Sequence, residues 1–142
     1  ASSRLVVDLD AISANYRALD NMSAAHTHTA ATAKANGYGL GVLAVSLAVM
    51  LADAALSVWH GYEALDLRAQ LNQSGITDTE IIIFEGVTHS DASVYTLNQL
   101  TAVVNQLSEL ELIQSWGDKA PPFLVHVDTA MSRLGFPADE AE

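Results

Sequence analysis

Lys34 lies in the segment whose residue types most clearly suggest chemistry, Ala-Thr-Ala-Lys-Ala-Asn-Gly-Tyr-Gly-Leu-Gly at residues 31–41. It is one of only two lysines in the chain, and small residues on both sides leave room for a planar ligand beside its amine. A lysine amine held in such a place can attack an aldehyde and form a Schiff base. The plain alternative, a surface lysine near a turn, stays open.

Arg133 stands in a second such segment, Val-His-Val-Asp-Thr-Ala-Met-Ser-Arg-Leu-Gly-Phe at residues 125–136. It follows the end of an expected strand, and Gly135 ends the turn. A guanidinium in this place can hold a carboxylate through paired hydrogen bonds. An ion pair with Asp128 or with another nearby acid would explain the arginine equally well, so both interpretations stand.

Two features of the turn after Lys34 bear on the kind of ligand. The glycines at 37, 39 and 41 are spaced G-x-G-x-G. This is neither the dinucleotide fingerprint nor the phosphate loop, whose lysine follows its glycines, so a nucleotide site is disfavoured. Tyr38 can hydrogen-bond a phosphate beside the amine, or it can simply pack in the turn.

The five histidines suggest less. The His-Thr-His run at 26–28 puts two imidazoles on one face of a strand, but no carboxylate stands at ligand spacing, so we expect no metal site. The His-Ser-Asp run at 89–91 contains the side-chain types of a catalytic triad, yet three successive residues rarely converge, and a polar turn or helix cap is favoured. His126 alternates with valines and points to the opposite side of its strand.

Composition excludes several classes of protein. Seventeen acidic residues against six basic ones give a formal net charge of −11, which disfavours nucleic-acid binding. Half of the 142 residues are apolar, so a single folded domain with a real core is expected. The longest apolar run, residues 42–52, is too short to cross a bilayer. The absence of cysteine and of a leader-like opening favours a cytoplasmic location.

Strands and helices alternate along the sequence, which predicts an α/β fold with a mainly parallel sheet, either a barrel or a doubly wound sheet. The expected strands are residues 5–9, 29–35, 56–59, 80–84 and 123–127. The expected helices are a segment capped by Asp10 that continues to about residue 22, then residues 42–53, 62–72 and 97–116. A (β/α)8 barrel takes roughly 250 residues, so four or five βα units would make a partial, TIM-like barrel.

The two long segments resemble the signatures of alanine racemase, in its N-terminal pyridoxal-phosphate barrel domain. The family's first motif is approximately Ala-Val-Val-Lys-Ala-Asn-Ala-Tyr-Gly-His-Gly, and residues 31–41 match its lysine, asparagine, tyrosine and last two glycines. Its second motif, approximately Lys-Val-Asp-Thr-Gly-Met-x-Arg-Leu-Gly-Phe, is similar to residues 126–136. Residues 7–11 and 63–68 also resemble the family, in the expected order.

The resemblance implies a cytoplasmic, dimeric isomerase that interconverts L- and D-alanine, the latter for cell-wall synthesis, with pyridoxal 5'-phosphate as cofactor. Lys34 would hold the cofactor as an internal aldimine and act as one acid/base. Tyr38 would bind the phosphate, and Arg133 would lie by the cofactor's phenolic oxygen and the substrate carboxylate. Residues 1–142 would form one domain, the N-terminal half of the racemase barrel.

The sequence also departs from the family. His126 stands where the family has a lysine, Ala130 replaces a glycine and Gly37 replaces an alanine. Only six residues separate Gly86 from Ser93, where the family has a helix and the start of a strand, which puts one βα unit in question. The family's second base, a tyrosine, and the arginine facing the pyridine nitrogen belong to later parts of its chain.

Three functions therefore remain open. The first is an alanine racemase-like enzyme, acting alone or paired with a C-terminal portion. The second is a non-catalytic barrel protein that binds pyridoxal phosphate, and basic amino-acid decarboxylases of the same barrel rank below it. The third is an inactive barrel fragment. Because a half barrel exposes two sheet edges, homo-oligomerisation or pairing with a second portion is expected in each case.

Overall fold

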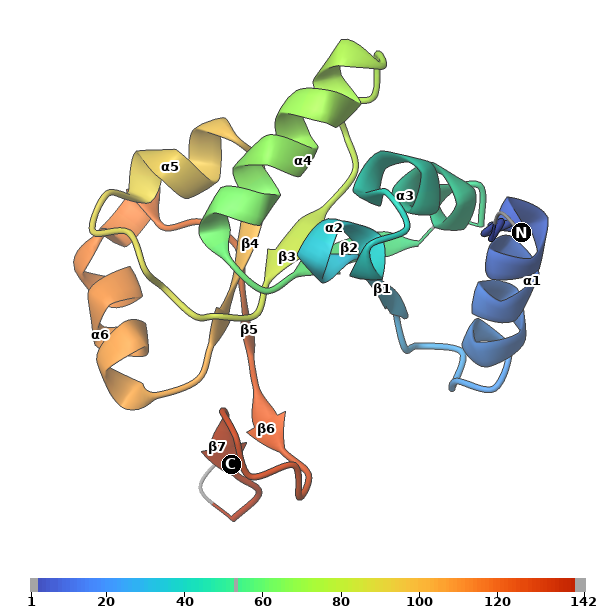
Figure 1. The fold of residues 1–142 in the computed structure, drawn as a ribbon. Coiled ribbons are helices and arrows are strands. Elements are labelled where there is room, and N and C mark those ends of the chain that lie inside the picture. Colours follow the sequence, from blue (N-terminus) through green and yellow to red (C-terminus); the bar gives the residue numbers. More distant parts are fainter. Residues whose placement is uncertain (1–2, 53, 140–142) are drawn as a thin grey trace.

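A parallel sheet of five strands, in the order β1-β2-β3-β4-β5, organises the molecule (Figure 1). The structure, a computed structural model, describes residues 3–52 and 54–139. The strands are β1 (Ala30–Thr32), β2 (Ala55–Val58), β3 (Ile81–Ile83), β4 (Leu100–Val104) and β5 (Phe123–Val125). A separate two-stranded sheet pairs β6 (Val127–Asp128) with β7 (Phe136–Pro137).

Helices connect successive strands, as a parallel sheet requires. The connecting elements are α2 (Lys34–Tyr38), α3 (Val42–Met50), α4 (Gly61–Gln73), α5 (Ala92–Leu97), α6 (Leu107–Ser115) and the 3-10 turn η1 (Gly117–Lys119), and α1 (Leu9–Asp20) precedes β1. In the core, α3 packs on β2, α4 on β2 and β3, and α5 on β4, while α1 packs on α3 at the side of the molecule (Figure 1). The predicted α/β class and the partial TIM-like barrel are confirmed.

The central strands bury both of their faces. Leu56, Ile81 and Ile83 belong to the main hydrophobic core. The alternate residues Ser57 and Thr101 are also buried, and the hydroxyls of Ser57 and Thr32 lie 3.1 Å apart across β1 and β2. This explains why the strands read as continuous apolar runs without clear alternation.

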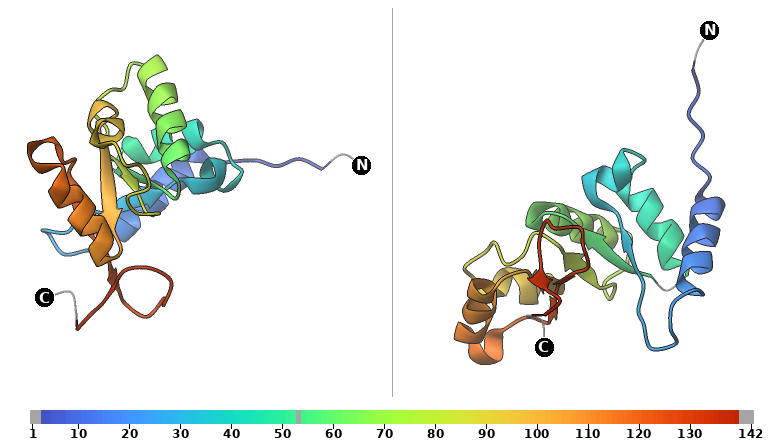
Figure 2. Two further views of the ribbon diagram at one scale, coloured as in Figure 1. Left: turned by 90° about the vertical axis from the view of Figure 1, so that its left-hand side faces the viewer. Right: turned by 90° about the horizontal axis from the view of Figure 1, so that it is seen from below.

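The expected strand at residues 5–9 is wrong. Residues 3–8 run away from the body of the molecule without secondary structure, and Leu5 and Val6 are exposed (Figure 2). The cap of α1 is Asp8 rather than Asp10, because the Oδ1 atom of Asp8 accepts a hydrogen bond of 2.9 Å from the backbone of Ala11. A β-branched run forms a strand only where a neighbouring strand pairs with it.

The expected helix at residues 97–116 is also wrong, because this stretch contains two elements. Leu100–Val104 forms β4, in which every residue is buried, and the helical part is α6. The short connection after Gly86 still accommodates α5, so the βα unit that the departure put in question is present. The other predicted elements lie within a few residues of their expected places, whereas α2, α5, β6 and β7 were not predicted.

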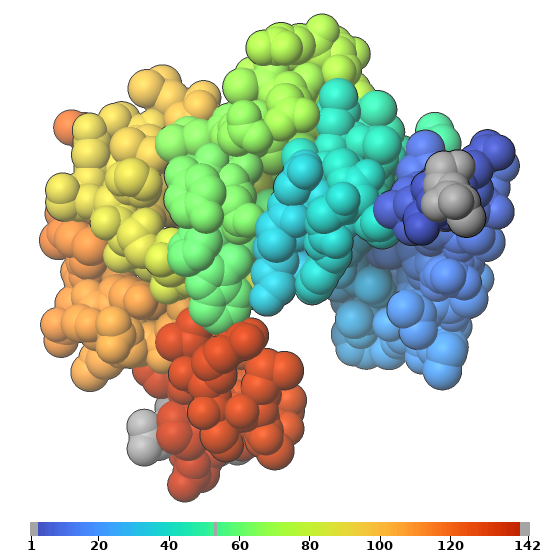
Figure 3. Space-filling model, in the orientation of Figure 1, coloured from blue at the N-terminus to red at the C-terminus, as the bar shows by residue number. Residues whose placement is uncertain are grey.

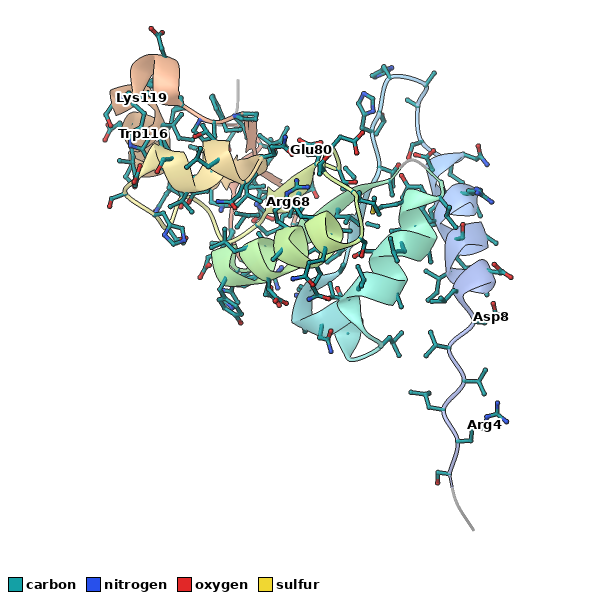
Figure 4. The ribbon with its side chains drawn as sticks, turned by 90° about the horizontal axis from the view of Figure 1, so that it is seen from above. Arg4, Asp8, Arg68, Glu80, Trp116 and Lys119 are labelled. Atoms are coloured by element: carbon teal, nitrogen blue, oxygen red, sulfur yellow. The ribbon has the colours of Figure 1, made fainter. Side chains whose placement is uncertain are left out.

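Arg68 ties α4 to the amino-terminal edge of the sheet (Figure 4). Only 3% of its surface is exposed, and its guanidinium donates to the carbonyl oxygens of Asn98, Thr79 and Gln99. Burial lowers the pKa of Arg68, and the nearby charge of Asp78 partly offsets this. This arginine is therefore structural, and it lies in the block at 63–68 that resembles the family.

Candidate active site at the carboxyl edge of the sheet

Lys34 and Trp59 lie at the same edge of the sheet because each follows a parallel strand. Lys34 comes directly after Ala33 at the end of β1, and Trp59 directly follows β2. In barrels of parallel strands this carboxyl edge carries the functional groups. Both side chains are half-buried, so packing restricts their conformation while part of each stays accessible to a ligand.

The indole of Trp59 brings Lys34 and Arg133 together. The Nζ atom of Lys34 lies 5.0 Å from the centroid of the Trp59 ring, and the Cζ atom of Arg133 lies 4.4 Å from it. Arg133 reaches this point from the loop between β6 and β7, and the C-terminal segment lies against the start of α4 (Figure 3). Within the described ranges Arg133 makes no ion pair, so the alternative of a pair with Asp128 does not hold.

The turn after Lys34 is backbone-strained. Ala35, Asn36, Gly37 and Tyr38 all have φ between 53° and 62°, in the left-handed region. Each non-glycine residue there costs roughly 1–2 kcal/mol. Strain of this kind persists only where surrounding contacts enforce it, and it gathers at functional sites. One such contact is the 2.9 Å hydrogen bond from the backbone of Val42 to the Oδ1 atom of Asn36.

Glu63 supplies the other contacts that enforce the turn. Its Oε1 atom accepts a hydrogen bond of 2.7 Å from the backbone of Ala35, and its Oε2 atom accepts bonds of 3.0 Å from Trp59 and His60. One carboxylate thus joins the loops that follow β1 and β2. Burial alone would raise the pKa of Glu63, but the three N–H donors favour the charged form and lower it below the ordinary value.

His126 is held by a buried amide. Its Nδ1 atom lies 2.7 Å from the Oδ1 atom of Asn105, whose Nδ2 atom donates to the carbonyl oxygen of Phe84 at 3.0 Å. Since the Asn105 oxygen only accepts, the Nδ1 atom of His126 carries a hydrogen. An imidazole stands where the family has a lysine, and it is anchored to the residue that follows β4.

The remaining predicted features lie apart from this contact. Tyr38 is 62% exposed on the strained turn, so its hydroxyl is free to meet a ligand. Asp91 accepts from the backbone of Ser93 at 2.9 Å and caps α5, which confirms the cap interpretation of the run at 89–91. In the part of the chain that the structure describes, no three His, Cys, Asp or Glu side chains could hold a metal ion, and no helix could span a membrane.

A hollow of about 690 Å³ lies at the opposite edge of the sheet. It is lined by residues that precede the strands, among them Thr29, Ala54 and Glu80. Neither Lys34 nor Arg133 lines it. Both cations instead pack against the Trp59 ring at the carboxyl edge.

Residues 7–142 match the model of the alanine racemase N-terminal domain. The chain belongs to this family. Among curated members, the alanine racemase of Cereibacter sphaeroides strain ATCC 17029 is 35% identical over all of this chain, and that of Rickettsia prowazekii is 33% identical over 97% of it. The chain spans only 40% and 34% of these relatives, respectively.

Solved structures agree with this membership. Alanine racemase from Bartonella henselae, crystallised with covalently bound pyridoxal phosphate, superposes on 94% of the chain with a TM-score of 0.74 and 33% identity. The enzyme from Bacillus anthracis with bound L-Ala-P gives 0.72 and 28% over 92% of the chain. The chain covers 37% and 33% of these two structures.

Sequence reasoning missed Trp59, Glu63 and Asn105. Trp59 was expected to end a strand, and this position at a carboxyl edge was the available signal that it lies on the same side of the sheet as Lys34. Glu63 lies in the first turn of the helix predicted at 62–72 and is the third residue of α4, where a carboxylate commonly accepts from backbone N–H groups. The partner of His126 left no signal, because Asn105 lies within the stretch that was predicted to be helical.

Proposed function

We propose that this chain is the lysine-bearing part of an alanine racemase and that residues 1–142 form one domain, the N-terminal half of the racemase barrel. The observation that carries the proposal is the convergence of Lys34 and Arg133 on Trp59, in a member of this family. An amine beside a guanidinium fits a ligand that combines an aldehyde with negative charge.

The residues present fit pyridoxal phosphate as cofactor. Two of the six Lys and Arg side chains of a strongly acidic chain gather at one ring, which favours an anionic ligand. Lys34 makes no ion pair among the described residues, so its amine is not committed to an acid. When bound, the pyridine ring delocalises the electron pair left behind when the α-hydrogen of an amino acid departs.

The chain's own side chains then have distinct roles. The Nζ atom of Lys34 carries the cofactor covalently and moves a proton at the α-carbon of the amino acid. The guanidinium of Arg133 binds the substrate carboxylate and the phenolic oxygen of the cofactor through paired hydrogen bonds. The hydroxyl of Tyr38 donates to the phosphate. Glu63 keeps the Lys34 turn in place without touching the substrate.

Reductive trapping tests the proposal. We expect that incubation with pyridoxal phosphate followed by borohydride adds one phosphopyridoxyl group to the intact chain, since imine formation releases water and reduction adds two hydrogens, and that peptide mapping finds it at Lys34. Lys119, exposed on η1, is the matched control, so Lys119→Arg should label normally and Lys34→Arg should not. Labelling of Lys119 alone, or of neither lysine, would refute the assignment.

Capture of the cofactor by this chain does not imply racemisation, because the chain spans well under half of the length of its curated relatives. If the chain that captures the cofactor also exchanges the α-hydrogen of alanine for deuterium, this would support catalysis by Lys34. Capture at Lys34 without any exchange would instead favour the second candidate, a non-catalytic protein that binds the cofactor.

A further inference from the structure

We infer that Trp59 is a positioning residue, whose indole holds the amine of Lys34 and the guanidinium of Arg133 at one point of the site. The packing itself is independent of any ligand. Its consequence for cofactor capture rests on the proposed function. Neither the family model nor the resemblance of the two motifs assigns a role to this tryptophan.

Among the residues that the structure describes, no other fixed partner brings the two cations together. Lys34 belongs to the turn after β1, and Arg133 to the exposed loop between β6 and β7. Neither pairs with an acid in the described parts of the chain. Two positive groups repel each other, whereas the face of an indole attracts both. The ring therefore offsets the repulsion that would otherwise separate them.

The indole is fixed firmly enough to do this. The backbone N–H of Trp59 donates to the Oε2 atom of Glu63 at 3.0 Å, and its carbonyl oxygen accepts from the backbone of Glu85 at 2.9 Å. The ring of His60 meets the indole edge to face, with centroids 6.4 Å apart. Since Glu63 also holds Ala35, one carboxylate sets the position of Trp59 relative to the Lys34 turn.

The consequence is a preformed cationic surface. Without the ring, the long side chains of Lys34 and Arg133 would spread into water, and a ligand would have to gather them again on binding. Such ordering of flexible side chains weakens association. Trp59 therefore speeds capture of an anionic aldehyde by holding Lys34 and Arg133 in place, and it takes no part in bond making itself.

The packing can be tested in the free protein by NMR, because the chain has only two lysines. In protein labelled with 13C-lysine, the ε-CH2 signal of Lys34 should lie upfield of that of Lys119, shifted by the indole ring, and should show NOEs to the ring protons. Lys119→Arg assigns the two signals. Trp59→Leu should return the Lys34 signal to the position of Lys119, and Trp59→Phe should keep part of the shift.

Wild-type lysine signals that coincide, with no NOE to an indole, would overturn the inference without any variant having to fold. The capture rate is the second readout. We expect borohydride-trapped labelling of Lys34 to slow about twofold to fivefold in Trp59→Leu, the size of one exposed cation–π contact, and to recover in Trp59→Phe. An unchanged rate in Trp59→Leu overturns the positioning role. If wild type shows the ring shift but no labelling, the proposed function fails and the packing stands.

Discussion

Replacing Glu63 by Gln is the sharpest test of how the candidate site is built. The change keeps the size of the side chain but removes one acceptor oxygen and the charge. The carboxylate now accepts from Ala35 on one oxygen and from Trp59 and His60 on the other. An amide can satisfy only one of these two sides, because its NH2 group would face N–H donors on the other.

The expected cost follows from these contacts. Hydrogen bonds to a charged group contribute about 1.5–3 kcal/mol and neutral ones about 0.5–1.5 kcal/mol. Glu63 is partly exposed, so we discount these values for solvent. Losing one or two of the three bonds and weakening the rest should lower the free energy of unfolding by about 1–3 kcal/mol. The strained turn at Ala35 should loosen at the same time.

The pH dependence has a definite sign. The folded-state pKa of Glu63 is lowered, so its stabilisation is fully present above the ordinary value of 4.5 and is lost as pH falls through the folded-state value. The stability difference between wild type and Glu63→Gln should therefore be constant near neutral pH and shrink below about pH 4.5.

Urea unfolding followed by circular dichroism measures this difference, and trapping at Lys34 measures the state of the turn. Glu109→Gln is the matched control, since Glu109 stands at the start of α6 and accepts from the backbone of Asn105 at 2.7 Å, away from the Lys34 turn. It should cost about 1 kcal/mol and leave trapping unchanged. Equal losses of stability and of trapping in both variants would refute the reasoning that Glu63 joins the two loops specifically.

Three further predictions concern other parts of the molecule. Ala130 has a φ of 92° where the family has glycine, so Ala130→Gly should stabilise the chain by about 1 kcal/mol. The same change at Ala14 in α1 should destabilise the chain by a similar amount, and the midpoints of urea unfolding measure both effects. Nitrogen NMR should find the hydrogen of neutral His126 on Nδ1, and Asn105→Leu should abolish that preference; an Nε2–H form in wild type would contradict the bond to Asn105. The exposed apolar edge at β5 should cause self-association in sedimentation experiments, which Leu124→Lys reduces, and a monomer at all concentrations would contradict this.

Much of the fold was predictable from local pattern. Short apolar runs such as Ile81–Ile83 are typical of strands covered on both faces, and the helical segments between them imply parallel connections. The prediction of a single helix at 97–116 was wrong because the apolar positions there, including Leu100, Val103 and Val104, fit a helical period and a buried strand equally well. Only the pairing of β4 with β3 and β5 distinguishes the two.

The sequence alone determined the family, the α/β class and the two segments that are proposed to carry the chemistry, because these depend on residue type and spacing within short stretches. The tertiary structure decided that Lys34 and Arg133 both pack against the ring of Trp59, that Glu63 joins the loops that carry Lys34 and Trp59, and that His126 is bound to Asn105. Each of these contacts joins residues brought together by strand order and by the path of a loop. The spacing of residues along the chain does not predict such distances, since a different order of strands would place the same segments together or apart.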